Sequence, residues 1–354
     1  MHIDANYKKF EKQHDLKIQD IEPNYSWSSE HMLDLVLRKQ EVLEENWVEK
    51  VIPKLVDKML TSYDKYDSLN YLEGKDLPSK AVVIDVLEHL LSILFPDYYE
   101  KRETIISDIR SFLNNTLNLI TDKLIEEINK SFKYICRKIE TCPKDVCVNR
   151  AQIVVKELLE QLPTIRAYLK GDLQAAFGGD PVARSIEEII LSYPCVLAIA
   201  TYRLAHELYI RGIPIIPRIM TEYAHSKTGI DIHPGAKIGK NFFIDHGTGV
   251  VIGETAEIGD DVKLYQGVTL RALSFTKDEK GQIIKGGKRH PTIGNNVVIY
   301  TGATILGGET FIGDAAVVGG NVWITTSIPS NTQVTIVPPK LRYKNINTHK
   351  KNKD

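Results

Sequence analysis

The sequence predicts an α+β protein in which an N-terminal all-helical domain is followed by a left-handed parallel β-helix of hexapeptide repeats. Three observations lead to this fold class. Of the 23 glycines, five lie in residues 1–228 and eighteen in residues 229–354. The first stretch is rich in Leu, Glu, Lys and Ile and shows apolar residues at helical spacing. The second shows a large aliphatic residue at every sixth position, so two architectures share the chain.

The composition is that of a globular protein. The chain has 354 residues, 43% of them hydrophobic and 26% charged, which is enough for two domains with a buried core. Its 45 Lys and Arg and 46 Asp and Glu give a formal charge of −1, which argues against nucleic acid as a partner. No apolar run reaches the about 18 residues of a transmembrane helix, and the polar start MHIDANYKKFEKQHD lacks a secretory h-region. We expect a cytoplasmic protein with no membrane partner.

Three of the four cysteines, Cys136, Cys142 and Cys147, form a C-x5-C-x4-C cluster. Metal sites usually contain more closely spaced cysteine pairs together with a second pair or histidines, and that pattern is absent from the sequence. We interpret the cysteines as ordinary buried or half-buried thiols in a reducing compartment, with a redox or metal role as the alternative.

The helical patterns divide the first part of the chain. A helix is expected from an N-cap at Ser28 or Ser29 to about residue 60, with Pro53 kinking or breaking it. Further helices are expected over 79–94, 100–139, 150–159, 161–177 and, after a GGDP turn, 185–212. We therefore predict an extended helical region over 1–165 and a second helical region over 166–228 that contributes Asp180. The β-helix follows over 229–328, and a C-terminal tail over 329–354.

The hexads specify a triangular prism. Three hexads make one coil of about eighteen residues, in which each hexad supplies a short strand and a sharp turn. The residue four places after each aliphatic is mostly small or β-branched, because it must fit near a corner. The inward aliphatics number twelve and predict about four coils: Ile232, Ile238, Ile244, Ile252, Ile258, Leu264, Ile293, Ile299, Ile305, Ile312, Val318 and Ile324.

Two interruptions of the repeat mark candidate functional segments. One is a two-residue slip between Ile244 and Ile252, and the other is a polar excursion over residues 271–291. Long loops on a rigid scaffold commonly carry function.

Titratable residues gather around these interruptions. Asp231 and His246 are fifteen residues apart, nearly one coil, which places them near one edge of the prism. A carboxylate that accepts a hydrogen bond from one imidazole nitrogen leaves the other as a base near neutral pH. Arg289 could hold a substrate carboxylate and Asp245 an ammonium group, which favours a zwitterionic substrate.

A metal site is the competing interpretation. Hexapeptide-repeat carbonic anhydrases bind zinc through three histidines, and His233, His246 and His290 all lie in the predicted β-helix. A zinc hydratase is therefore a second hypothesis, although the acidic residues and the arginine in the same segments favour an organic substrate without a metal.

The run DIHPGAKIGKNFFIDHGTGVVIGETAEIGDDVKLYQGVTL, followed by GGKRHPTIGNNVVIYTGATILGG, closely resembles the serine O-acetyltransferase family. The resemblance extends upstream to the GDP at 179–181 and to ATYRLAHELY, and covers roughly residues 170–330. It implies transfer of an acetyl group from acetyl-CoA to the hydroxyl of L-serine, giving O-acetylserine for cysteine biosynthesis.

The resemblance also implies roles for individual residues. His246 matches the catalytic base, and Asp231 the residue that orients its imidazole. Asp180 and Asp245 match the carboxylates that hold the substrate ammonium, and Arg289 and His290 match the groups around the substrate carboxylate. Backbone contacts with CoA are expected at four residues: Thr301, Gly302, Gly319 and Gly320.

The family implies assembly as a trimer, or as a dimer of trimers, with each active site between neighbouring β-helices. It also implies feedback inhibition by L-cysteine. The chain ends in HKKNKD, where many bacterial members have a terminal isoleucine, so the sequence does not support a stable complex with O-acetylserine sulfhydrylase. A hexapeptide-repeat acyltransferase with another hydroxyl acceptor is the alternative function.

Two further departures from the family pattern concern the CoA side. Arg271 and Ala272 stand where members often have two glycines, and the loop to RHP is longer than usual. Val317 stands where many members have a lysine, which weakens any phosphate contact at that position.

Overall fold

The computed structural model describes residues 46–66, 69–70, 77–99, 108–137, 145–274, 281–282, 286–337, 340 and 342–343. The chain divides into two compact units, Met1–Glu73 and Gly74–Asp354. The start of the helix expected from Ser28 or Ser29 lies outside the described residues.

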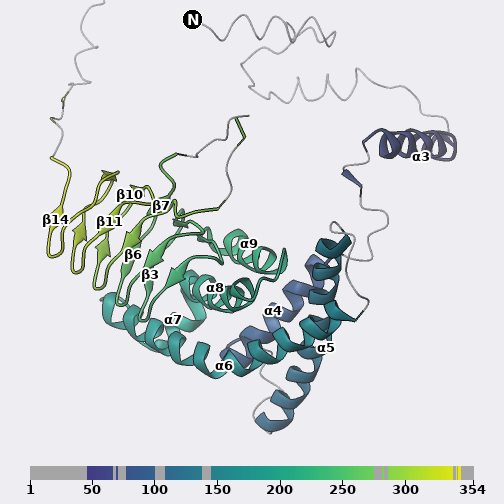
Figure 1. Ribbon diagram of the computed structural model, residues 1–354, viewed down its shortest axis with the longest axis horizontal. Coiled ribbons are helices and arrows are strands. Elements are labelled where there is room, and N and C mark those ends of the chain that lie inside the picture. Colours follow the sequence, from purple (N-terminus) through teal and green to yellow (C-terminus); the bar gives the residue numbers. More distant parts are fainter. Residues whose placement is uncertain are drawn as a thin grey trace, which may run out of the picture. The chain divides into compact units, whose positions relative to one another are not determined.

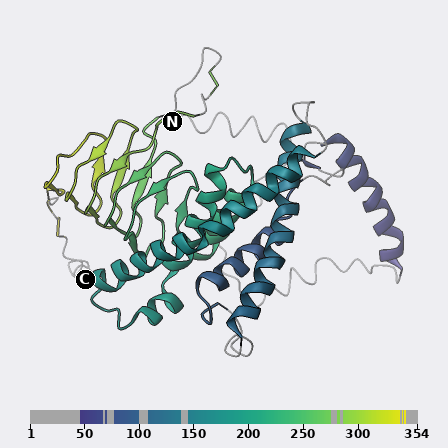
Figure 2. The ribbon, with the colours of Figure 1, turned by 60° about the horizontal axis from the view of Figure 1, so that its bottom comes forward.

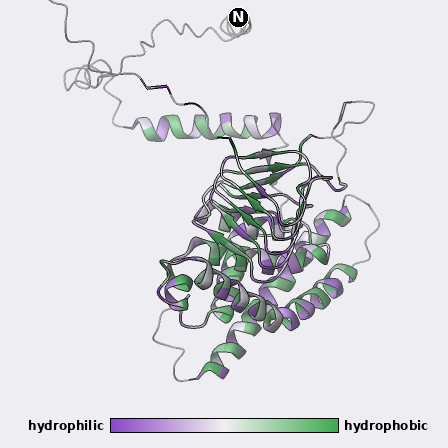
Figure 3. Ribbon diagram, turned by 90° about the vertical axis from the view of Figure 1, so that its left-hand side faces the viewer, coloured by the Kyte–Doolittle hydropathy of each residue, from purple (hydrophilic) through white to green (hydrophobic). Residues whose placement is uncertain are grey.

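In the first unit the described helix is α3 (Trp47–Lys65), which contains Pro53 and has no buried residue. The sequence predicts that Pro53 kinks or breaks a helix. It does not break α3, which continues for three turns beyond it. A proline removes one backbone hydrogen bond, which a long helix can tolerate. Hydrophobic and hydrophilic residues alternate along the ribbon of α3 (Figure 3).

The described residues of the second unit begin with the helices α4 (Lys80–Leu94), α5 (Ile109–Arg137), α6 (Val146–Gly179), α7 (Ile186–Ser192), α8 (Pro194–Ile210) and α9 (Ile216–Thr228). Ser79 caps α4 by accepting a hydrogen bond from the Val82 amide. The long helices α5 and α6 lie beside α4 at one end of the unit, and α8 and α9 lie against the first strands (Figures 1 and 2).

Two prolines affect these helices differently from each other. The sequence predicts two helices over 150–159 and 161–177, but α6 is one helix that includes Pro163 and crosses the predicted 165/166 boundary. The expected helix over 185–212 is instead divided at Tyr193, and Pro194 opens α8. A proline fits the first turn of a helix, where its missing N–H costs no hydrogen bond.

The β-helix consists of three parallel sheets, with strand orders β1-β4-β7-β10-β13, β11-β8-β5-β2 and β14-β12-β9-β6-β3. Successive strands lie in different sheets, so the chain winds around a prism (Figure 1). The predicted fold class, a helical region followed by a left-handed parallel β-helix, is confirmed. The strands are β1 (Asp231–Ile232), β2 (Lys237–Ile238), β3 (Phe243–Asp245), β4 (Val251–Ile252), β5 (Glu257–Ile258), β6 (Lys263–Tyr265), β7 (Thr269–Arg271), β8 (Thr292–Ile293), β9 (Val298–Ile299), β10 (Thr304–Leu306), β11 (Phe311–Ile312), β12 (Val317–Val318), β13 (Trp323–Ile324) and β14 (Gln333–Val334).

All twelve predicted inward aliphatics lie in strands, and all but Ile238 are buried. The structure adds two strands that the count of twelve omits. Leu270 is fully buried in β7 and pairs with Ile252 and Ile305, and Val334 pairs with Val318 at the end of the stack. The β-helix therefore has about five coils rather than four.

The helices are joined to the first coil by a buried ion pair. Arg203 on α8 donates to both carboxylate oxygens of Asp172 on α6, at 2.7 and 2.8 Å. Asp172 also accepts from the Phe242 amide, and Arg203 donates to the Gly239 carbonyl. These contacts fix the end of α6, where Asp180 lies, against the β-helix.

Within the described residues, no single helix has both the length and the apolar composition of a membrane span. The pair α7 and α8 passes the same test only when taken together, with a bend of 78° between them.

Candidate active site

One corner of the prism collects most of the predicted site. It is formed by the turns that follow β3, β6, β9 and β12, and we call it the histidine corner because His246 opens its first turn. The turns stack through backbone hydrogen bonds from Gly267 to Thr248, from Gly302 to Gln266 and from Asn321 to Thr301, at 2.8–3.0 Å. The residues predicted to contact CoA, Thr301, Gly302, Gly319 and Gly320, therefore lie in one column with His246.

The backbone at His246 is in the left-handed region, with φ of +57°, and Gly247 follows at +91°. This conformation is uncommon for a residue with a side chain. The two residues added by the slip after Ile244 allow the wider turn. The His246 side chain is 75% exposed, so the imidazole is open to a ligand.

A pocket of about 320 Å³ lies beside His246 and is lined by Asp180, Tyr193, Cys195 and Asp245 among others. The structure thus brings together three residues that the sequence analysis selected from segments 65 positions apart. The His246 Nε2 lies 3.9 Å from the Asp245 Oδ1. Two carboxylates beside an imidazole can bind a cationic group next to a base.

Asp180 is the C-cap of α6, and both of its carboxylate oxygens are engaged. The Tyr193 hydroxyl donates to Oδ2 at 2.6 Å, and the Val182 amide donates to Oδ1 at 2.9 Å. These hydrogen bonds, Tyr193 first, lower the pKa of Asp180, which stays ionised. The same bond raises the pKa of Tyr193 to about 12, so its hydroxyl keeps its proton and remains a donor.

Lys263 on β6 is a site residue that the sequence analysis missed. Its Nζ lies 3.1 Å from the Asp245 Oδ2 and donates to the Gly179 carbonyl at 2.7 Å. Burial by itself would lower the pKa of Lys263, but hydrogen bonds with Tyr265 and Asp245 raise it, so the side chain is a cation. The pairing of Phe243 with Lys263 across twenty positions would have indicated the contact, but the slip after Ile244 obscures that register.

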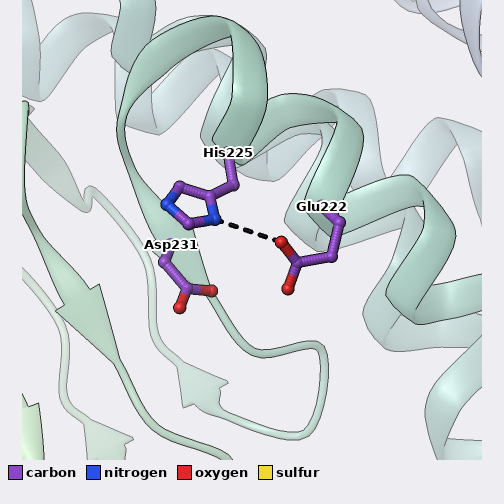
Figure 4. A group of neighbouring side chains, drawn as sticks. All are labelled: Glu222, His225 and Asp231. Carbon is purple, nitrogen blue, oxygen red and sulfur yellow. Dashed lines mark hydrogen bonds and ion pairs between the residues drawn. The ribbon is translucent and has the colours of Figure 1, made fainter. Parts of the chain in front are cut away.

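Asp231 lies in a different set of contacts from the one predicted. It does not form an ion pair or hydrogen bond with His246 within this chain, although its amide bonds the Val250 carbonyl of the same corner. Its carboxylate instead lies close to Glu222 and His225 of α9, and Figure 4 shows the three side chains facing one another. Their ligand atoms lie within 4.8 Å of one another, but the Arg218 guanidinium already pairs with Glu222 and lies 3.9 Å from Asp231.

Arg289 and His290 lie at another corner, formed by the turns after β1 and β4 and by the end of the long loop; we call it the arginine corner. A pocket of about 380 Å³ there is lined by Tyr209, Glu254 and Arg289. Arg289 forms an ion pair with Glu254, and the Tyr209 hydroxyl donates to the same carboxylate at 2.5 Å. The hydrogen bond from Tyr209 and the charge of Arg289 lower the pKa of Glu254.

His290 is buried in this corner and does not line its pocket. Its Nδ1 accepts from the Thr255 amide at 3.0 Å, and its ring packs on Gly253, where an added Cβ would lie 2.1 Å from the His290 Cδ2. Burial, with a smaller effect of Arg289, lowers the pKa of His290 to about 4. The residue is therefore a neutral ring that fixes the end of the loop beside Arg289.

The three histidines of the alternative zinc hypothesis do not meet in one chain. His233 and His290 belong to the arginine corner, and burial followed by the charge of Arg218 lowers the pKa of His233 to about 4. His246 belongs to the histidine corner. Among the described residues, the group of potential metal ligands that forms is Glu222, His225 and Asp231, not the three histidines.

Serine acetyltransferases are among the known proteins that this chain resembles in sequence and structure. No family model matches the chain. A plasmid-encoded serine acetyltransferase of Synechococcus elongatus is 45% identical over 261 residues, which are 73% of this chain and 82% of the relative. Serine acetyltransferase of Helicobacter pylori is 46% identical over 164 residues, covering 46% of this chain and 90% of the relative.

Solved structures of Entamoeba histolytica serine acetyltransferases have the same fold. Isoform 1 in complex with L-cysteine is 42% identical, with a TM-score of 0.62, and the match covers 71% of this chain and 86% of that one. Isoform 3 in complex with cysteine is 40% identical, also with a TM-score of 0.62, over 74% of this chain and 84% of that one. The resemblance that the DIHP, DHGTG and RHP segments carry is thereby confirmed, and the chain belongs to the serine acetyltransferase family of acyltransferases.

Proposed function

We propose that this chain transfers the acetyl group of acetyl-CoA to the hydroxyl of L-serine and forms O-acetylserine. The observation that carries the proposal is the pocket at the histidine corner, where the carboxyl groups of Asp180 and Asp245 flank an exposed imidazole at the head of a column of turns. The carboxylates bind an ammonium group, and the imidazole accepts a proton from a hydroxyl beside it.

In the proposed reaction, Asp180 and Asp245 hold the ammonium of L-serine while His246 takes the hydroxyl proton. The serine oxygen attacks the thioester carbonyl carbon, the carbon–sulfur bond breaks, and CoA leaves as the thiol after receiving the proton from His246. General-base catalysis of this kind contributes about 10²–10⁴-fold, so positioning of both substrates supplies the remainder. Acetyl-CoA runs along the histidine corner past Thr301, Gly302, Gly319 and Gly320.

The position of Arg289 supports a composite site. A clamp for the substrate carboxylate is needed close to His246, yet Arg289 lies at the other corner of the same chain, paired with Glu254. A homotrimer with its β-helices side by side brings the arginine corner of one chain to the histidine corner of the next. In the same assembly, Asp231 of one chain reaches the His246 imidazole of a neighbouring chain.

L-cysteine is the proposed feedback inhibitor, because it carries the same ammonium and carboxylate groups as serine. The Entamoeba histolytica relatives crystallised with cysteine support this assignment.

The decisive assay follows thiol release from acetyl-CoA with L-serine, in parallel with other hydroxy amino acids, a hydroxylated sugar and no acceptor. We expect L-serine to be the preferred acceptor and L-cysteine to compete with it. Release that does not exceed the acceptor-free rate would exclude acetyl transfer to serine, and equal rates with a sugar would favour a different acyltransferase.

A further inference from the structure

Two cysteines far from both pockets face each other where α5 ends and α6 begins. Cys136 is the second-last residue of α5, and Cys147 is the second residue of α6. Their sulfur atoms lie 3.5 Å apart. Cys147 is 4% exposed, whereas Cys136 is half-buried and so accessible to a small reagent.

The distance is close to what a covalent bond requires. A disulfide has an S–S length of about 2.05 Å, so the two sulfurs need to approach by roughly 1.5 Å. Both residues lie at helix ends that adjoin the segment 138–144, which links α5 to α6. Each side chain has one rotatable bond to its sulfur, and a helix end adjusts at lower cost than a helix interior.

We propose that Cys136 and Cys147 are a redox modification site, which closes to a disulfide across the α5–α6 hairpin when a small disulfide oxidant such as oxidised glutathione is present. The inference depends on the helical hairpin alone and is independent of the proposed acetyl transfer.

The exposures of the two thiols set the order of the steps. The Cys136 thiolate attacks one sulfur of oxidised glutathione, which forms a mixed disulfide and releases one glutathione thiolate. Cys147 lies in the first turn of α6, where the helix dipole stabilises a thiolate. It then attacks the Cys136 sulfur and releases the second glutathione. The two cysteines lose two protons and two electrons in all, and the oxidant becomes two molecules of reduced glutathione.

The bond would connect the ends of two helices that pack side by side in the helical region (Figure 2). A cross-link closed over a short loop removes conformational freedom from the unfolded chain, so the oxidised hairpin resists unfolding more than the reduced one. The midpoint of thermal unfolding is therefore expected to rise on oxidation and to return after treatment with a dithiol reductant.

Trypsin separates the relevant cysteines, which makes the test direct. Cys136 falls in the peptide YICR, Cys142 in IETCPK and Cys147 in DVCVNR. The full chain is treated with oxidised glutathione, remaining thiols are alkylated, and the digest is analysed without reduction by mass spectrometry. We expect YICR linked to DVCVNR, about 2 Da below the sum of the two peptides because two hydrogens are lost.

Matched variants make the result unambiguous. Cys142→Ser should leave the YICR–DVCVNR link and the rise in unfolding midpoint intact, whereas Cys136→Ser and Cys147→Ser should abolish both. Circular dichroism of the reduced variants checks that they fold. The proposal is overturned if treated protein keeps both thiols alkylatable, or if the link that forms joins IETCPK to either partner.

Discussion

The Lys263 Nζ lies 3.1 Å from the Asp245 Oδ2 and donates at the same time to the carbonyl of Gly179, the residue before Asp180. One ammonium group thus ties β6 to β3 and to the end of α6, and it sets the spacing of the two carboxylates proposed to bind the substrate. The centroids of the Phe243 and Tyr265 rings lie 5.0 and 4.4 Å from the same Nζ, and the two rings pack against it.

Lys263→Met should therefore raise the KM for L-serine about tenfold, the size of one lost charge-assisted hydrogen bond. Without the cation, the carboxyl groups of Asp180 and Asp245 lose the group that holds them in place, and the end of α6 loses one of its contacts with the β-helix. The KM for acetyl-CoA should stay unchanged, because the CoA column does not include Lys263. Lys263→Arg should restore part of the affinity, and Lys240→Met, at an exposed position, is the control. An unchanged serine KM in the methionine variant would contradict this role.

His246→Ala should lower kcat by about 10²–10⁴-fold, since it removes the proposed general base. Its side chain is 75% exposed within the single chain, so folding should be unaffected, and we expect the oligomer to persist. Steady-state kinetics give the rate, and circular dichroism and light scattering check the fold and the oligomer. A variant with normal turnover would show that another group takes the serine proton.

The composite site leads to a complementation experiment. His246→Ala and Arg289→Ala should each be inactive alone, because each damages every site of a homotrimer. Subunits of the two variants, unfolded and refolded together, should regain part of the activity, since some interfaces then combine an intact histidine corner with an intact arginine corner. Refolding each variant separately is the control. Activity that stays absent in the mixture, although both variants refold and associate, would contradict the composite site.

Asp172→Asn should lower the free energy of unfolding by about 3–5 kcal/mol, because it leaves the buried Arg203 without its counter-ion. Both partners are almost fully buried, at 5% and 7% exposure of their side chains. Urea denaturation monitors the loss, and Lys156→Ala, in an exposed pair with Glu160, provides a control expected to change stability by less than about 1 kcal/mol. Equal effects of the two substitutions would contradict a structural role for the buried pair.

Acid should weaken the arginine corner. The folded protein keeps His233 and His290 neutral, with pKa values of about 4, whereas the unfolded chain protonates its histidines near pH ~6.5. The unfolded state therefore binds more protons between these values, and stability should fall as the pH is lowered from about 6.5 to 4. His290→Asn, whose amide oxygen can still accept from Thr255, should show a shallower loss. Urea midpoints at pH 7 and pH 5 measure the loss in the unsubstituted protein and in the variant. Equal losses in the two would contradict the view that protonation of His290 contributes to the fall in stability.

The fold could be predicted from the sequence because the determinant of the β-helix is local. An inward aliphatic at every sixth residue specifies a coil whatever surrounds it, and the twelve chosen residues all lie in strands. Leu270 escaped the count because its coil is interrupted directly after it by the excursion. The helix bounds were harder to predict. Pro163 lies inside α6, and the sequence does not reveal whether packing compensates for the hydrogen bond that a proline removes.

The residues of the candidate site could be predicted where they lie in local sequence motifs. Asp245 and His246 were selected because titratable residues gather at the slip in the repeat, and Asp180 because the family resemblance marks it; the structure places all three around one pocket. Lys263 and Tyr193 were missed because their contacts depend on register across coils and on where α6 ends. The contacts of Asp231 with α9 likewise arise from helix packing that no sequence pattern encodes.

The long loop has a consequence for how this fold varies. It leaves the prism after β7 and returns at β8, so the partners Glu257 and Thr292 are 35 positions apart where neighbouring coils need about twenty. The paired strands nevertheless stay in register above and below the insertion, because each coil bonds only to its neighbours. The length of the loop between β7 and β8 therefore does not affect how the coils pair. Relatives can lengthen or shorten the loop freely, provided that its last residues still return Arg289 to the corner that Thr255 holds in place.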